Sequence, residues 1–209
     1  PRISQPVDTI HIKDFEVEDL ALKLTGDEVP VINIVPGQIV TKKTMEKPKI
    51  ENDSVVADTS RDILKIAVVE RHKASGNIGI GLIKGFGLKK GAVASSVAHD
   101  SHNIIAIGTN DQDLAAAIKE EELMQGGLVM VLNGEAIGRM ELPIAGLLSL
   151  DTGEAAAGQL HDLEILLKVM GVNVESPFTV LSFMALPVIP EIRITDKGVI
   201  DVNKFEVIA

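Results

Sequence analysis

The stretch Asn77–Asp111, NIGIGLIKGFGLKKGAVASSVAHDSHNIIAIGTND, is the part around which the rest of this sequence is organised. A glycine-rich run, residues 76–91, leads to two histidines, His99 and His102, and an apolar run, residues 104–107, follows them. Glycines at this density indicate close approach between backbones, positive φ angles, or both. The segments on either side of the histidines are apolar and predict buried strands. A functional site is therefore expected first between these two strands.

The length of the chain, 209 residues, suits one large domain or two small ones and allows a sizeable core. Hydrophobic residues make up 45% of it, which is typical of a globular protein and excludes a disordered one. We predict a single domain over residues 1–209, with a lead-in segment, residues 1–25, and a core, residues 26–209. The first residue is Pro1, so we expect a processed chain or a piece of a longer protein.

Charge and composition exclude several classes of function. The net charge of −10 opposes binding to phosphate, so no nucleic-acid partner is expected. No apolar run reaches the roughly 20 residues of a membrane helix, and no signal peptide is recognisable, so no membrane association is expected. The absence of cysteine excludes disulfides, thiolate zinc sites and a cysteine nucleophile, and it suits the reducing cytoplasm.

Many short apolar runs and few helices determine the predicted fold class. One helix is predicted to begin at Thr109-Asn110-Asp111, with an Asx or Thr cap, and to end at Gly126-Gly127; another covers residues 152–170. Asn133-Gly134 between apolar runs predicts a β-hairpin. Further strands are predicted around residues 10–15, 31–35, 39–41, 54–57, 62–70, 92–98, 104–108, 191–195 and 199–205, with a turn or bulge at Pro36-Gly37. The pattern favours an α+β fold of mostly antiparallel or mixed sheets, a layered sandwich with a few helices on its outer faces.

Five other segments have less regular patterns. Residues 16–24 suit a short helix or a strand, and residues 25–28 a turn. The polar segment 42–53 reads as a loop or hairpin tip. The charged residues 70–73 read as an exposed strand end. Residues 177–186 are mostly apolar and are predicted to be buried, in a core or against a partner.

The five residues His99, Asp100, Ser101, His102 and Asn103 form the predicted site. If this segment is extended, His99, Ser101 and Asn103 share one face; if it is a helical turn, His99 and His102 lie together. In either arrangement one histidine lies beside a group that can fix its tautomer or bind a metal with it. The alternative is a polar turn whose side chains cap backbone groups between two strands.

The spacing His-x-x-His is a weak metal signal, because a catalytic zinc site normally has about three protein ligands. A third ligand would have to come from His72, Asp111, Glu70 or His161. His72 precedes the glycine-rich run and could approach His99 across a pair of strands. The run itself lacks the arrangement of a dinucleotide or phosphate loop, and no nucleophile elbow surrounds Ser95-Ser96. His161 and Glu164 are predicted to face solvent.

The segment VAHDSHNIIAIGTND resembles the matching segment of bacterial and archaeal adenine deaminases, which belong to the amidohydrolase superfamily. Other segments are similar too: VINIVPGQIVTKK, DILKIAVVERHKASGNIGIGLIKGFGLKKG, LPIAGLLS and LSFMALPVIPEIRITDKGVIDV. The resemblance covers nearly the whole chain, from about Ile10 to Phe205. It implies a metal-dependent hydrolase of purine salvage and adenine catabolism, which converts adenine to hypoxanthine and ammonia.

The family's binuclear centre, of manganese or iron with zinc also found, belongs to a TIM-like barrel that opens with a His-x-His motif. This chain has no His-x-His and is too short to hold such a barrel. The resemblance therefore implies a C-terminal domain whose partner is its own catalytic barrel, whose metal ligands lie outside this chain, and which is inactive alone. A homo-oligomer is also expected.

The resemblance makes the segment from His99 to Asn103 the most distinctive loop of such a domain. We expect His99, Asp100, His102, Asn103 and, nearby, His72 to face the barrel mouth as accessory catalytic groups, with Asn110-Asp111 close in sequence. Two other interpretations stay open. The domain could be purely structural, stabilising the barrel and an oligomer, or it could be an independent metal hydrolase built on its own histidines.

Overall fold

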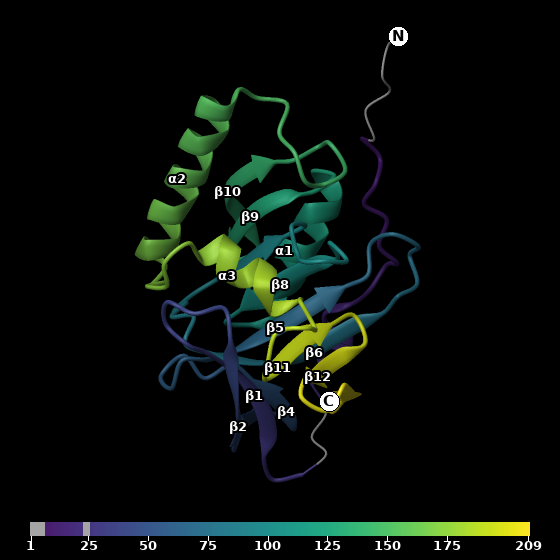
Figure 1. Cartoon of the computed structure of the whole chain (residues 1–209), viewed down its shortest axis with the longest axis vertical. Coiled ribbons are helices and arrows are strands. Elements are labelled where there is room, and N and C mark those ends of the chain that lie inside the picture. Colours follow the sequence, from purple (N-terminus) through teal and green to yellow (C-terminus); the bar gives the residue numbers. More distant parts are fainter. Residues whose placement is uncertain (1–6, 23–25) are drawn as a thin grey trace.

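The computed structural model describes residues 7–22 and 26–209, and its centre is an eight-stranded sheet (Figure 1). In spatial order its strands are β10 (Glu135–Glu141), β9 (Gly127–Leu132), β7 (Ala92–Ser95), β8 (Ile104–Gly108), β5 (Ile63–Val69), β6 (Ile78–Lys84), β1 (Val29–Ile34) and β2 (Thr41–Glu46). Neighbouring strands are antiparallel except β1 and β6, which are parallel. The predicted α+β class with mostly antiparallel and mixed sheets is confirmed.

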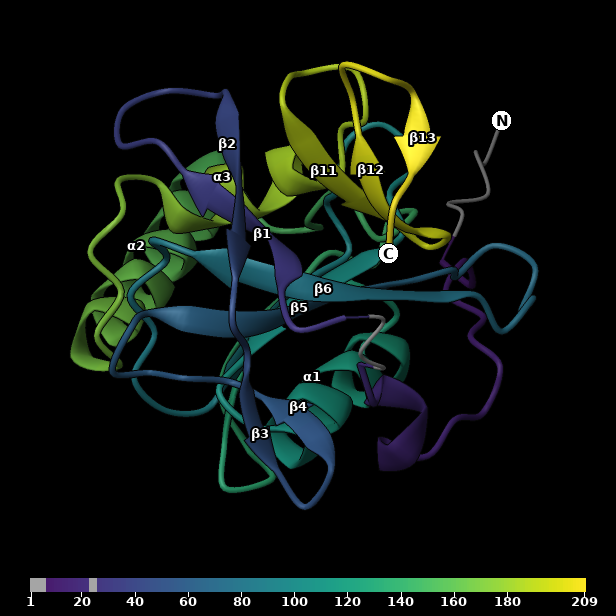
Figure 2. The same ribbon diagram turned by 90° about the horizontal axis from the view of Figure 1, so that it is seen from below.

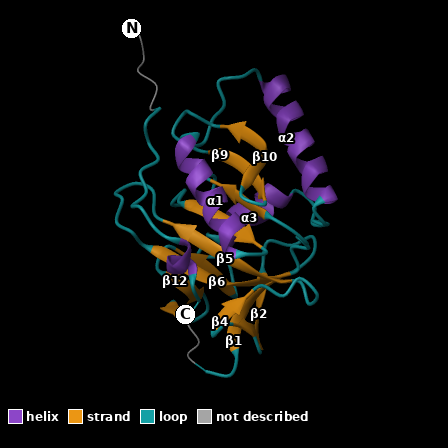
Figure 3. Ribbon diagram, turned by 180° about the vertical axis from the view of Figure 1, so that it is seen from behind, coloured by secondary structure: helices purple, strands orange, loops and turns teal. Residues whose placement is uncertain are grey.

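The central strands bury both of their faces, and alternate side chains enter two separate cores. In β5, Ala67 and Val69 belong to one core, whereas Ile66 and Val68 belong to the other. The first core lies under α1 (Asp111–Leu123), the short 3₁₀ helix η1 (Val17–Leu20) and the lead-in segment. Figure 3 shows α1 in front of the strands from this side.

The second core lies under α2 (Gly153–Val169), α3 (Pro177–Met184) and a small sheet of β11 (Ile192–Thr195), β12 (Gly198–Asp201) and β13 (Glu206–Val207). Figure 2 shows this small sheet and α3 on one side of β5 and β6, with α1 on the other. The molecule is thus a three-layer sandwich with helices on its outer faces, as predicted. In the described part of the chain, no helix is long and apolar enough to cross a membrane.

The glycine-rich run forms β6 and the turns after it, and two of its glycines allow the small sheet to approach. A Cβ atom on Gly79 would lie 1.8 Å from the carbonyl oxygen of Thr195, and one on Gly81 would lie 2.6 Å from Val199 Cγ2. Gly85 has a positive φ of 96°, which a residue with a side chain rarely adopts. Both expected reasons for the glycines, close approach and positive φ, are therefore present.

Several local predictions are confirmed. The side-chain oxygen of Asn110 accepts a hydrogen bond from the backbone N–H of Asp113 at 2.7 Å and caps the start of α1. Asn133 and Gly134 both have positive φ and join β9 to β10 in a tight hairpin. Residues 177–186 are largely buried and begin with the helix α3.

The prediction of a loop over residues 42–53 is wrong for most of the segment, and only Asn52-Asp53 form the hairpin tip that was the alternative. This segment forms most of β2 and, after a short connection, β3 (Lys49–Glu51), which pairs with β4 (Ser54–Val56). Its polar composition has a physical reason, because β2 is the edge strand of the large sheet and β3 is exposed. Charged side chains on an edge strand are compatible with strand pairing and protect against association.

The predicted strand at residues 10–15 is also wrong, although Ile10, Ile12 and Phe15 are buried. The side-chain oxygen of Gln125 accepts hydrogen bonds from the backbone N–H groups of Thr9 and Ile10, at 3.0 and 3.2 Å. A side chain near the end of α1 therefore takes the place of a partner strand. Residues 16–24 were expected to form a short helix or a strand, and their described part contains the helix η1. Residues 23–25, which include the end of this segment and the first residue of the predicted turn, lie outside the described residues.

Candidate functional site

The predicted site residues form a compact turn between β7 and β8. The backbone N–H of His102 donates to the carbonyl of Ala98 at 2.6 Å, and the N–H of Ala98 donates to Nδ1 of His102 at 3.3 Å. The rings of His99 and His102 lie 5.5 Å apart, edge to face. Of the two arrangements that the sequence allowed, the structure has the turn in which the histidines lie together. We call residues 98–103 the histidine turn.

His102 is half-buried, and its environment favours the neutral ring. Burial, together with the charges of His99 and Arg71, lowers the pKa of His102 below its usual value. Because Nδ1 accepts the N–H of Ala98, the neutral ring carries its proton on Nε2. His102 is therefore held as a neutral hydrogen-bond donor, a form suited to polarising a carbonyl or a ring nitrogen.

The neighbouring residues differ in exposure. His99 is half-buried, its backbone N–H donates to the carbonyl of Ser182 at 3.2 Å, and its ring lies 5.2 Å from that of Phe183. Asp100 is exposed, whereas Asn103 is buried, and its side-chain oxygen has no partner among the described residues. The histidine turn is therefore buried or half-buried at Asn103 and His99, and its tip at Asp100 is exposed.

His72 reaches the histidine turn, as the sequence suggested. Strands β5 and β8 are antiparallel neighbours, and Val69 pairs with Ile104, so the chain after β5 lies beside the chain before β8. The Nε2 atom of His72 lies 2.7 Å from the carbonyl oxygen of Ser101. The contact is with the backbone of the turn and not with the ring of His99. Three histidines nevertheless gather at this end of the inner strands.

The predicted exposed strand end at residues 70–73 is half wrong, because Glu70 and Arg71 are buried. The carboxylate of Glu70 accepts the backbone N–H groups of His72, Lys73 and Ser75 at 2.5–3.0 Å. Burial raises the pKa of Glu70, but these hydrogen bonds outweigh it and hold the pKa below its usual value. Glu70 fixes the turn that carries His72.

A cavity of about 290 Å³ lies beside the histidine turn, and His99 is part of its wall. Most of the lining is apolar, from β9, β10 and the two outer helices. Ser182 adds a buried hydroxyl that has no hydrogen-bond partner among the described residues. The turn therefore borders a small apolar hollow that offers few polar groups.

The other residues considered from the sequence lie elsewhere. Asp111 is 2.7 Å from the buried Nζ of Lys65, and with Asn110 it borders a separate cavity of about 780 Å³. His161 is exposed on α2 and Glu164 is half-buried there. Within residues 7–22 and 26–209, no three His, Asp or Glu side chains lie close enough together to hold a metal ion. The donors present at the histidine turn do not fit a binuclear centre.

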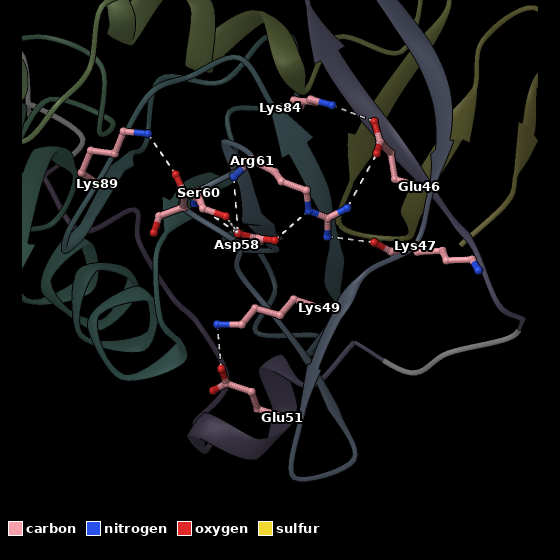
Figure 4. A network of polar contacts seen from close by, with 10 residues as sticks. Glu46, Lys47, Lys49, Glu51, Asp58, Ser60, Arg61, Lys84 and Lys89 are labelled. Carbon is pink, nitrogen blue, oxygen red and sulfur yellow. Dashed lines mark hydrogen bonds and ion pairs between the residues drawn. The ribbon is translucent and has the colours of Figure 1, made fainter.

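A second polar network joins the two small strands to the edge of the large sheet (Figure 4). Arg61 Nε donates to the carboxylate of Asp58 at 2.7 Å, and its NH2 group donates to the carbonyl of Lys47 at 2.9 Å. Lys84 Nζ binds Glu46 at 2.8 Å. Hydrogen bonds from Ser60 and Arg61 lower the pKa of Asp58 well below its usual value. This network holds strands together and does not contact the histidine turn.

Fold and site together define a class: an α+β sandwich domain with a histidine turn at the ends of two inner strands of its main sheet. The sequence matches the family described as the adenine deaminase C-terminal domain over residues 38–206, and the chain belongs to this family. The resemblance noted in the sequence is thus confirmed.

Several adenine deaminases are similar to this chain. That of Dehalococcoides mccartyi strain BAV1 is 52% identical over 202 residues, which are 97% of this chain and 35% of the relative. The protein of Methanothrix thermoacetophila is 47% identical, over 90% of this chain and 33% of the relative. That of Bacillus pumilus is 44% identical, over 95% and 35%. The chain spans about a third of the length of these curated relatives.

Proposed function

We propose that this chain acts as the C-terminal domain of an adenine deaminase, which hydrolyses adenine to hypoxanthine and ammonia in the cytoplasm. The similarity to adenine deaminases over nearly the whole chain supports this. Manganese or iron bound in a preceding barrel domain would supply the activated water for hydrolysis. The residues of this chain hold no metal in the proposal, and residues 1–209 form one domain that has no turnover by itself.

The role of this domain is to present the histidine turn to the active site of the barrel. The observation that carries this role is the convergence of His72, His99 and His102 on one turn with an exposed tip. His102 supplies a neutral hydrogen-bond donor, and Asp100 and Asn103 complete the polar set. Closing such a turn over adenine excludes water from the site and strengthens its electrostatic interactions.

Alanine substitutions in the full-length enzyme test this role. His99→Ala and His102→Ala should each lower kcat/KM for adenine by about tenfold or more, corresponding to roughly 1.4 kcal/mol of transition-state stabilisation. His161→Ala is the matched control, because His161 is exposed on α2 and belongs neither to the histidine turn nor to the lining of the cavity beside it. Unchanged kcat/KM in both turn variants would contradict the proposed role.

A second candidate function is purely structural, with the domain stabilising the barrel and a homo-oligomer. Two exposed apolar side chains one turn apart on α2 favour this function: Val169 is 69% exposed and Ile165 47%. Neighbouring exposed apolar side chains of this kind are typical of a contact surface. In that case Val169→Asp should shift the full-length enzyme to a smaller species in sedimentation, while the histidine variants keep their activity.

A further inference from the structure

Arg71 is buried where β5 ends, with 2% of its surface exposed. Its three nitrogen groups donate to the carbonyls of three separate segments. Nε donates to His102, NH1 to Thr9 at 3.1 Å, and NH2 to Ala145 at 3.0 Å. The planar guanidinium holds its donors in a fixed fork, so it fixes the relative positions of the groups that accept from it.

The surroundings of Arg71 are tightly packed, and the three hydrogen bonds of its side chain all go to main-chain carbonyls. A Cβ atom on Gly146 would lie 3.1 Å from NH1 of Arg71 and equally close to Ile10 Cδ1. The hydroxyl of Ser96, just before the histidine turn, donates to the carbonyl of Gly146 at 2.7 Å. The lead-in segment, the turn near residue 145 and the histidine turn therefore form one packed unit around the guanidinium.

Arg71 contacts the histidine turn at His102, whose ring is a hydrogen-bond donor in the proposed function. It binds the carbonyl of His102, the residue whose ring nitrogen accepts the N–H of Ala98. The ring of His102 is thus fixed by Ala98, and its main chain is fixed by Arg71. Loss of the hydrogen bond from Arg71 would leave the ring of His102 free to tilt relative to that of His99. A misplacement of about 1 Å can cost catalysis on the order of 10²-fold.

We propose that Arg71 is a positioning residue for the deamination, which fixes the histidine turn relative to the lead-in segment and to the turn at Ala145. This inference rests on the proposed function of the histidine turn. In a C-terminal domain, the preceding domain joins at the end where Thr9 lies. Arg71 therefore connects the approach of the catalytic domain directly to the residues offered to its active site.

The test uses the full-length enzyme with Arg71→Lys, which keeps the charge but cannot reach three carbonyls, and Arg71→Met, which removes every donor. The control is Arg193→Lys, because Arg193 is also fully buried but donates to the carbonyl of Ile39 and to no carbonyl of the histidine turn. In Arg71→Lys we expect kcat to fall about tenfold with a smaller change in KM. Amide hydrogen exchange should rise together in residues 8–10, 98–103 and 143–147.

A double variant separates positioning from general loss of stability. If Arg71 acts through the histidine turn, Arg71→Lys should cause little further loss of kcat in a His102→Ala background. Additive losses, or unchanged exchange in residues 98–103 of a folded Arg71→Lys enzyme, would overturn the inference. If the proposed function itself is wrong, the result is different, because His99→Ala and His102→Ala are then as active as the wild type. If Arg71→Met does not fold, Arg71→Lys alone decides.

Discussion

Replacement of Gly79 by alanine should destabilise the fold through a collision between two backbones. The new Cβ would lie 1.8 Å from the carbonyl oxygen of Thr195 and 2.7 Å from the backbone nitrogen of Gly198. Ordinary contacts of a Cβ begin at 3.4 Å, so the hairpin of β11 and β12 would have to withdraw by about 1.6 Å. Backbone on both sides cannot yield as a flexible side chain can.

The cost follows from the packing that this movement loosens. Ile194 and Val199 of the hairpin are fully buried against the main sheet. A gap of roughly 0.5–1 Å already forfeits a quarter to a half of a dispersion contact. Burial of each side chain is worth roughly 1.5–3 kcal/mol, so losing about half for both lowers the free energy of unfolding by about 1.5–3 kcal/mol.

Urea unfolding of the chain, followed by circular dichroism, measures this loss. Gly158→Ala is the matched control, because Gly158 lies inside α2 and a Cβ there meets nothing within 4 Å. The same chemical change should there raise the free energy of unfolding by roughly 0.5–1 kcal/mol. The reasoning is refuted if Gly79→Ala unfolds within about 0.5 kcal/mol of the wild type, the usual range of a neutral surface substitution.

Four further substitutions test buried or partly buried ionisable groups, each by urea unfolding. Burial lowers the pKa of His102, so the fold favours the neutral ring and loses stability as pH falls below about 6.5, the unfolded value; His102→Gln should remove this part of the acid destabilisation. Burial raises the pKa of Glu121 well above 4.5, so the fold favours the protonated acid and loses stability as pH rises above that value. Glu121→Gln should therefore be more stable than the wild type in alkaline buffer, and a pH-independent difference would contradict this. Asp111→Ala leaves the ammonium of Lys65 buried without its counter-charge and should cost about 3 kcal/mol, whereas Lys65→Met, which leaves a quarter-exposed carboxylate, should cost less.

Local signals in the sequence predicted the elements whose ends depend on their own residues. The strand at Ile104–Gly108 was predicted with its observed bounds, because a run of buried apolar residues specifies a strand by itself. The cap at Asn110 and the hairpin at Asn133-Gly134 each depend on a few neighbouring residues. The glycine-rich run indicated a close approach, but only the structure shows that the partner is the hairpin near Thr195.

The misassigned segments are those whose partners lie far away in the chain. Residues 10–15 look like a strand, but the backbone N–H of Ile10, like that of Thr9 before it, binds Gln125, more than 110 residues later. The polar segment after Thr41 looks like a loop because its place at the sheet edge, which permits charged side chains, is decided by β1. Hydrophobic periodicity carries no information about such contacts.

The candidate site likewise has features that the sequence predicted and features that only the tertiary structure decided. The sequence by itself identified the histidine turn and the approach of His72, because these follow from residue types and from two strands that flank the turn. It determined the α+β class and the resemblance to adenine deaminases. Only the tertiary structure decided that His99 and His102 lie together and that Arg71 is buried beneath them. The physical reason is that the carbonyls satisfying this guanidinium come from segments 31, 62 and 74 residues away, which meet only when the layers have packed.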